Sequence, residues 1–401
     1  MKPGWEQRAL SEVCSFENGD RGKNYPGKKA FVPVGVPFIN AGHLDGGAID
    51  WDGMDYIPED RFKQLGSGKI RKGDLLFCLR GSLGKFGVVK RETMGAIASS
   101  LVIVRPNSQL DRDFLAHYFR SSLAKEMVDK FAGGAAQPNL SAKSLKAFRI
   151  PLPPFEEQQA IVATLDKAFE GLDRARKNAG RNLESARELF ASILNGALTS
   201  NASEKMDWEV KPIGQIADHC LGKMLDKNKN KGTPKPYLRN LNVRWFDFDL
   251  TDILEMKFED REVDRYTARK GDLLVCEGGY PGRAAIWDQD TPIFFQKALH
   301  RVRFHEPQRN KWFLYYLLKC DLDGSLKNHF TGSGIQHFTG KSLARFTMPV
   351  PPLEEQQQII ARLDGIKEDI DNIDKQYCAS LENLDQLRQT ILQKAFAGEL
   401  V

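Results

Sequence analysis

Two long stretches of the chain carry the hydrophobic spacing of a helix that packs along its length. In both stretches, apolar or small residues recur at alternating steps of four and three. The first set is Ile161, Leu165, Ala168, Leu172, Ala175, Ala179, Asn182, Ala186, Leu189 and Ile193. The second set is Ile359, Leu363, Ile366, Ile370, Ile373, Tyr377, Ser380, Leu384, Leu387 and Ile391. A spacing of about 3.5 residues kept over several heptads is typical of one helix packed on another.

The two hydrophobic seams differ in size, which indicates that they face each other. The first is rich in alanine and the second in isoleucine and leucine, and small residues opposite large ones let two backbones approach closely. The pattern therefore predicts that the two helices pack together within one chain. Pairing of each helix with a second molecule is the alternative that the pattern leaves open.

Each helix has a recognisable start. Pro-Pro, then Phe or Leu, then Glu-Glu stand at residues 153–157 and 351–355. Proline is tolerated in the first helical turn, where its missing N–H costs nothing, and acidic residues there meet the positive end of the helix dipole. We therefore expect long helices over residues 153–198 and 351–401.

The second half of the chain restates the first at an offset of about 198 residues. Residues 151–166 and 349–364 are identical at 11 of 16 positions. Weaker echoes keep the same order: Trp5-Glu6 with Trp208-Glu209, residues 72–78 with 270–276, and residues 143–145 with 341–343. Each half is therefore predicted to be a globular part followed by a helix.

The globular parts have a mixed pattern that predicts α+β domains over residues 1–152 and 199–350. Short apolar runs punctuated by glycine, such as 74–79, 86–89 and 100–104, indicate strands. Residues 111–131 have helical spacing, through Phe114, Tyr118, Leu123 and Met127.

The order of the parts predicts that the two helices are antiparallel. The first helix ends where the second globular part begins, and the second helix starts where that part finishes, so both ends lie beside the same domain. One domain is then expected at each end of the rod. Helices of about 43 residues at about 1.5 Å per residue would hold them roughly 65 Å apart, a little under two turns of B-DNA.

Charge is balanced overall but segregated locally. The chain has 58 Lys and Arg against 53 Asp and Glu, a net charge of +5. Between Lys223 and Arg244, however, seven basic residues face the single acid Asp226. This pattern favours a local phosphate-facing surface, although a solvated lysine-rich loop would have the same composition.

Composition excludes several other classes of protein. No stretch approaches the roughly 20 apolar residues of a membrane span, and no signal peptide is apparent, so we expect a cytoplasmic protein. The six cysteines lie far apart without a Cys-x-x-Cys pair, and the seven histidines lack metal-ligand spacing. We therefore expect reduced thiols and no metal site.

With its two Pro-x-Pro-Pro-[Phe/Leu]-Glu-Glu-Gln-Gln junctions and the closing segments 192–198 and 390–400, the chain resembles the specificity subunit of Type I restriction-modification systems over essentially its whole length. The resemblance implies two target recognition domains, each reading one half of a bipartite, asymmetric site in double-stranded DNA. It implies that the helices set the unread spacer and dock two modification subunits, which are adenine methyltransferases. Restriction subunits, with motor and nuclease activities, can join that complex.

Two motifs invite a catalytic interpretation that the residues do not support. Leu152-Pro-Pro-Phe155 looks like an amino-methyltransferase motif, but leucine has no side-chain amide or carboxylate to bind the target amine. Residues 334–342 approach a P-loop, with one residue too many between the glycines. We therefore expect a non-catalytic subunit without a cofactor of its own.

Base reading needs directional donors and acceptors on loops that enter a groove, with cations for the phosphates. Three loops of each domain qualify: an early basic loop, the loop after the shared Lys-Gly-Asp-Leu-Leu strand, and a glycine-rich loop before the last short helix. The candidates in the first domain are Arg21, Lys23, Asn24, Lys28, Lys29, Arg80, Ser82, Lys85, Gln137 and Asn139. Those in the second are Lys223, Lys227, Lys229, Lys231, Arg239, Tyr280, Arg283, Gln336 and His337.

A different class of function stays open from the residues alone. A coiled-coil scaffold that binds only proteins would explain the helices, although not the basic, glycine-rich loops in both domains. Salt dependence separates the two hypotheses, since cation-to-phosphate binding weakens steeply as salt rises. An enzyme would need an acid–base or nucleophile constellation that the sequence does not show.

Overall fold

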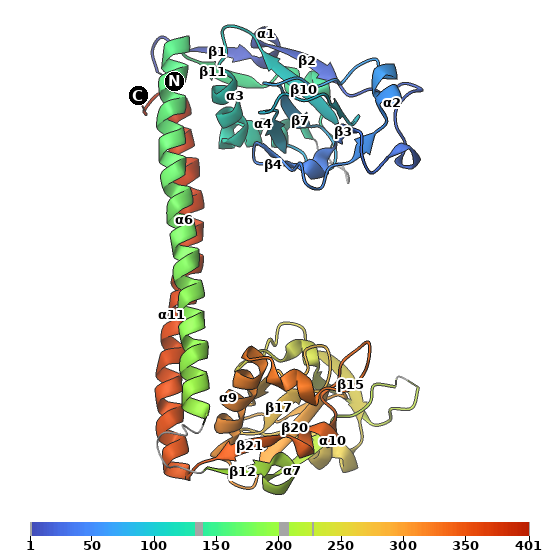
Figure 1. Cartoon of the computed structure of the whole chain (residues 1–401), viewed down its shortest axis with the longest axis vertical. Coiled ribbons are helices and arrows are strands. Elements are labelled where there is room, and N and C mark those ends of the chain that lie inside the picture. Colours follow the sequence, from blue (N-terminus) through green and yellow to red (C-terminus); the bar gives the residue numbers. More distant parts are fainter. Residues whose placement is uncertain (1, 133–138, 200–207, 227, 401) are drawn as a thin grey trace. The chain divides into compact units, whose positions relative to one another are not determined.

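The computed structural model describes residues 2–132, 139–199, 208–226 and 228–400, with only the backbone of Lys28. The chain divides into two compact units, residues 1–179 with 378–401 and residues 180–377. Each unit contains one α+β domain and a part of both long helices (Figure 1), as the sequence predicted.

The first unit is built on an antiparallel sheet of order β2-β10-β7-β8. A second sheet, β6-β3-β9, and two pairs, β1 with β11 and β4 with β5, complete it. The strands are β1 (Glu6–Ala9), β2 (Cys14–Asn18), β3 (Val36–Ile39), β4 (Leu44–Asp45), β5 (Ala48–Ile49), β6 (Tyr56–Ile57), β7 (Leu75–Cys78), β8 (Phe86–Val88), β9 (Ala96–Ile97), β10 (Leu101–Pro106) and β11 (Arg149–Leu152). The helices are α1 (Leu10–Val13), α2 (Glu59–Gln64), α3 (Arg112–Arg120), α4 (Ser122–Ala132), α5 (Ala142–Lys146) and α6 (Phe155–Leu198), which continues into the second unit.

The second unit repeats this plan with the sheets β13-β20-β17-β18 and β15-β14-β19-β16 and the pair β12 with β21. Its strands are β12 (Glu209–Pro212), β13 (Ala217–Leu221), β14 (Thr233–Leu238), β15 (Leu254–Phe258), β16 (Thr267–Ala268), β17 (Leu273–Cys276), β18 (Ala284–Ile286), β19 (Ile293–Phe295), β20 (Leu299–Phe304) and β21 (Thr347–Val350). Its helices are α7 (Ile213–Ile216), α8 (Val263–Tyr266), α9 (Arg309–Leu322), α10 (Gly340–Arg345) and α11 (Leu353–Ala397), which ends in the first unit. The internal repeat is thus a repeat of structure.

The Glu-Glu-Gln-Gln motif fastens the start of each long helix to its domain. Glu157 accepts a hydrogen bond from Trp5 Nε1 at 3.1 Å, and Glu355 accepts one from Trp208 Nε1 at 3.3 Å. The side chain of Gln158 is fully buried and donates to the carbonyls of Gln109 and Pro153. Gln356, at the same place in the second half, is also buried and donates to Pro351 O at 2.6 Å, so the repeated glutamine binds the start of each long helix.

The two long helices pack against each other in opposite directions. In the first unit, Asp173 pairs with Arg388 and Arg176 with Asp385, so numbers rise along α6 as they fall along α11. In the second unit, Arg187 pairs with Asp374, while Gly180 lies beside Tyr377. The predicted antiparallel pair within one chain is confirmed.

The hydrophobic seam was predicted wrongly at several positions. On α6 the second half of the seam runs through Leu183, Phe190 and Leu194, one residue beyond the predicted Asn182, Leu189 and Ile193. A helix with about 3.6 residues per turn drifts by about 20° per heptad against a strict 3.5 spacing, so the buried face moves on by one residue. On α11, Ile373 and Leu387 are exposed, and the neighbouring Asp374 and Arg388 make the cross-helix ion pairs.

The helix predicted over residues 111–131 is two helices, α3 and α4, separated at Ser121. The backbone of Ser121 is extended, and its amide and hydroxyl both donate to the carbonyl of Tyr118. Serine competes for backbone partners in this way and favours helix ends. The break turns α4 away from the line of α3, which hydrophobic spacing alone does not reveal.

In each unit, an aspartate of the long helix binds side chains of the domain, and the two aspartates occupy the same place in the repeat. Asp166 on α6 accepts from His117 Nε2 at 3.0 Å, whereas Asp364 on α11 accepts from Tyr315 Oη at 2.7 Å and from Lys311 Nζ at 2.6 Å. His117 Nδ1 lies 3.4 Å from a guanidinium nitrogen of Arg120. Burial first, and then Arg120, lower the pKa of His117 below its ordinary value, although Asp166 opposes the shift.

Because of His117, the stability of the first unit is expected to decrease in acid. Because its folded pKa is lowered, His117 contributes no pH dependence above its unfolded pKa of about 6.5, and unfolding becomes easier as the pH falls below that value. We expect the urea midpoint of the first unit to decrease between about pH 7 and about pH 5.5, less steeply in His117→Gln than in the parent. Equal slopes in parent and variant would contradict this role for His117.

Candidate nucleic-acid interface

The loop that follows the shared Lys-Gly-Asp-Leu-Leu strand has the same backbone in both units. We call residues 78–85 the first glycine loop and residues 276–283 the second glycine loop. In the first, Gly84 N donates to Cys78 O and Lys85 N to Ser82 O; in the second, Gly282 N donates to Cys276 O and Arg283 N to Tyr280 O. Gly81, Gly84, Gly279 and Gly282 all have φ between +78° and +88°, a backbone region that favours glycine.

The structure brings described parts of the predicted loops of each domain together beside one turn. In the first unit, Leu79 N donates to Ser100 O, Arg21 donates to Ser99 O at 3.3 Å, and Leu140 N donates to Leu79 O. In the second unit, Glu277 N donates to Ala298 O, Lys297 N to Lys223 O, and Phe338 N to Glu277 O. Segments far apart in the sequence therefore form one surface in each domain.

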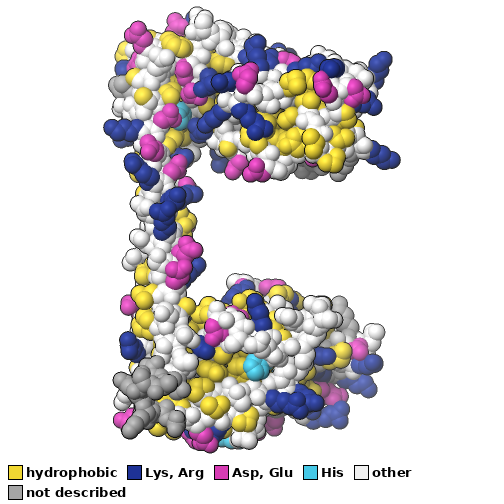
Figure 2. All heavy atoms as spheres, viewed as in Figure 1, with side chains coloured by type: hydrophobic (Ala, Val, Ile, Leu, Met, Phe, Trp, Pro, Cys, Tyr) yellow, Lys and Arg dark blue, Asp and Glu magenta, His cyan; other side chains and the backbone are white. Residues whose placement is uncertain are grey.

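Several predicted side chains stand exposed on these loops. In the first unit they are Lys23, Lys29, Arg80, Ser82, Lys85 and Asn139. In the second unit they are Lys229, Lys231, Tyr280 and Gln336, with Arg239, Arg283 and His337 partly covered. Figure 2 shows Lys and Arg side chains on the surface of both domains, and exposed donors of this kind are available to a nucleic acid. Gln137, Lys227 and the side chain of Lys28 lie outside the described residues.

Other predicted side chains are bound within their own domain. Lys223 is buried, and its ammonium donates to Glu262 at 2.5 Å and to Lys257 O at 3.0 Å. Asn24 donates to Gln64 O at 3.1 Å. Burying a cation is costly unless it is paired, so the paired Lys223 stabilises the base of its loop.

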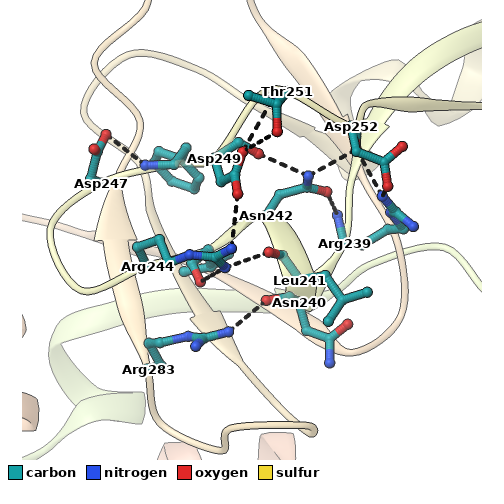
Figure 3. A network of polar contacts seen from close by, with 12 residues as sticks. Arg239, Asn240, Leu241, Asn242, Arg244, Asp247, Asp249, Thr251, Asp252 and Arg283 are labelled. Atoms are coloured by element: carbon teal, nitrogen blue, oxygen red, sulfur yellow. Dashed lines mark hydrogen bonds and ion pairs between the residues drawn. The ribbon is translucent and has the colours of Figure 1, made fainter. Parts of the chain in front are cut away.

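A polar network fixes the segment between β14 and β15 in the second unit (Figure 3). Arg239 donates to the carbonyl and carboxylate of Asp252, Asn242 donates to Asp249 O at 2.9 Å, and Arg244 reaches the Asp249 carboxylate at 2.9 Å. Hydrogen bonds from Thr251, and the charge of Arg244, lower the pKa of Asp249. Arg283, at the end of the second glycine loop, donates to Asn240 O at 3.0 Å.

Tyr280 lies at the tip of the second glycine loop. Its hydroxyl donates to Asp321 at 3.1 Å, and the guanidinium of Arg283 lies 5.1 Å from its ring centre. Burial, and then the charge of Asp321, raise the pKa of the Tyr280 phenol. The phenol is therefore uncharged at neutral pH, and its exposed ring is available for stacking or apolar contact.

Two structural features of the domains were not predicted from the sequence. Asn240 joins the segment after β14 to the second glycine loop. The lysines of this region were singled out from the sequence, whereas Asn240 was not. In the first unit, Lys72 and Lys90 line a hollow of about 430 Å³ together with Arg120 and Asp166. The repeated Lys-Gly-Asp motif was a signal for Lys72, whereas nothing in the sequence placed Lys90 beside it.

The family model described as Type I restriction modification DNA specificity domain matches residues 2–179 and again residues 205–383. The chain belongs to this family. Both copies of the repeat match, so the two domains are two copies of one specificity domain, and the chain is a specificity subunit.

Curated relatives agree over the full length. The Type I restriction enzyme EcoKI specificity subunit of Escherichia coli K12 is 24% identical, covering 100% of this chain and 90% of the relative. The StySPI specificity subunit of Salmonella potsdam has the same identity and coverage. As a specificity subunit, the chain is a non-catalytic component of a Type I restriction-modification complex, and its role implies DNA target recognition.

Solved structures share the fold. A chain of a type I R-M system aligns with a TM-score of 0.80 at 22% identity, covering 100% of this chain and 99% of that one. The HsdS subunit from Thermoanaerobacter tengcongensis aligns with a TM-score of 0.58 at 21% identity, covering 100% and 98%. Across the described part of the specificity subunit, no helix has the length and hydropathy to cross a membrane.

Proposed function

We propose that each domain of this specificity subunit reads one half of a bipartite, asymmetric site in double-stranded DNA. The observation that carries the proposal is the pair of glycine loops, which share one backbone but differ in side chains. Arg80, Ser82 and Lys85 in the first loop stand where Gly278, Tyr280 and Arg283 stand in the second. Different donors on one framework would read different bases. The reading domains are residues 1–152 and 199–350.

The long helices, residues 153–198 and 351–401, are proposed to set the spacer and to dock two modification subunits. Leu189, Ile373 and Leu387 leave 61%, 36% and 46% of their surface exposed on these helices. Exposed leucine and isoleucine on a two-helix rod favour further helices as partners. A surface repeated twice would bind two copies of an adenine methyltransferase subunit, to which restriction subunits are added.

The early basic loop of the second domain offers a test against a scaffold that binds only proteins. Lys229 is exposed and 3.4 Å from Asp226, and Lys231 is exposed. We expect the triple change Lys227→Ala, Lys229→Ala and Lys231→Ala to weaken DNA binding at moderate salt. The slope of log K against log salt should fall by about two to three, since each phosphate contact contributes about 0.9. Fluorescence anisotropy with a duplex at several salt concentrations measures both.

A matched control removes two lysines of the same domain that lie outside the three predicted loops. Lys211 pairs with Glu209 at 2.9 Å and Lys270 with Asp290 at 2.8 Å. Lys211→Ala with Lys270→Ala should change the salt slope by less than the triple variant does. A triple variant that binds DNA as tightly as the parent would reject the assignment of this loop. Salt-independent binding of the parent would favour the scaffold.

A further inference from the structure

The second glycine loop is held by an asparagine that the first unit lacks. Asn240 is the first residue of a short 3-10 turn after β14, and Nδ2 of its side chain donates to Gly278 O at 3.0 Å. The corresponding turn of the first unit, after β3, begins with Ala41. Alanine has no donor, so the first glycine loop has no such bond.

The two glycine loops also differ in how closely they are packed. A Cβ added at Gly279 would overlap the side-chain amide of Asn240, and one at Gly282 would overlap Leu326. Among the residues that the structure describes, a Cβ at Gly81 would meet nothing within 4 Å, and one at Gly84 would lie 3.6 Å from Val128. The first loop instead borders a hollow of about 750 Å³. Among the described residues, the first loop is therefore packed less closely than the second.

Asn240 contacts both ends of the second glycine loop. Its side chain binds Gly278 near the beginning, and its backbone carbonyl accepts from Arg283 at the end, at 3.0 Å. Figure 3 shows Arg283 reaching this carbonyl from beside the network that fixes Arg239 and Asn242. That network holds Arg239 and Asn242, the residues on either side of Asn240 and Leu241. Asn240 is therefore in place before any ligand binds.

We propose that Asn240 is a positioning residue for base reading by the second domain. It clamps the second glycine loop, so this domain presents Tyr280 and its neighbours on a rigid loop, whereas the first domain reads through a loop that adjusts on binding. A preorganised loop loses less conformational freedom on binding and rejects a wrong base more sharply. This inference rests on the proposed function and deepens it.

The test uses the full subunit in complex with its modification subunits. A pool of duplexes carries every single-base change in both half-sites, and methyl transfer to each duplex is measured by sequencing. Exchanging residues 199–350 for those of another family member identifies the half read by the second domain. Asn240→Ala installs the residue of the first unit, and Asn240→Asp keeps the shape while removing the donor. Leu250→Ala changes an exposed side chain of the same segment, 42% exposed, as a control.

We expect both Asn240 variants to lose about tenfold in discrimination against single-base changes in the second half-site, with the first half-site unaffected. Leu250→Ala should discriminate as the parent does. Unchanged discrimination, or methylation that falls equally on every duplex, would overturn the positioning role. If Asn240→Ala does not fold, Asn240→Asp decides the question. A parent complex that methylates without sequence preference would overturn the proposed function itself, which the parent measurement alone reveals.

Discussion

Deleting one matched heptad from both long helices is expected to shorten the spacer of the recognised DNA site by about two to three base pairs. Residues 173–179 of α6 lie opposite residues 382–388 of α11, as the ion pairs of Asp173 with Arg388 and Arg176 with Asp385 show. Removing both segments shortens the pair by about 10 Å and keeps the heptad register. Methylation at the parental spacing should fall at least about a hundredfold, since a displaced recognition domain loses its contacts with the DNA.

The control keeps the length and removes the contact. Arg176→Ala with Asp385→Ala deletes an exposed ion pair between the helices, which is worth at most about 1 kcal/mol. Its spacer should equal that of the parent. The measurement is methylation of duplexes whose spacers differ by single base pairs. An unchanged spacer in the deletion variant would reject the helix pair as the ruler.

Phe396→Ala is expected to cost the first unit about 3 to 5 kcal/mol of unfolding free energy, as large aromatic truncations in a core do. Phe396, near the end of α11, is 3% exposed, and its ring centre lies 5.0 Å from that of Phe114 and 5.9 Å from that of Tyr118. The last turns of the chain thus complete the core of the domain at its beginning. Urea denaturation followed by circular dichroism measures the change.

Leu387→Ala provides the comparison on the same helix. Because Leu387 is exposed, the change should cost less than about 0.5 kcal/mol. A cost below about 1 kcal/mol for Phe396→Ala would contradict the packing of α11 on the first domain.

Sequence patterns predicted the large features because each rests on a strong local signal. Proline, acidic residues and heptad spacing predicted the long helices, which run over Phe155–Leu198 and Leu353–Ala397. The repeat and the chain order predicted two similar α+β domains and an antiparallel helix pair, and both are confirmed. The seam was displaced along α6 because a helix with about 3.6 residues per turn drifts against a strict heptad, which brings Leu183, Phe190 and Leu194 to the buried face.

The candidate interface was predictable in outline only. Glycine-rich and basic loops were recognisable, but their convergence on one turn depends on β-sheet pairing between distant segments. Whether a lysine is exposed or buried depends on tertiary neighbours, so Lys223 and Lys229 look alike in the sequence, although Glu262 binds one of them in the interior. Asn240 was not predicted either, because only the fold brings it beside its partner Gly278.

We infer that two unlike recognition domains on one helix pair specify a bipartite site. Mapping methylated adenines across the genome of the source organism tests it most directly. We expect one asymmetric motif with two different specified halves separated by a fixed, unread gap, methylated on both strands. A single continuous motif, two identical halves, or a gap that varies from site to site would contradict it.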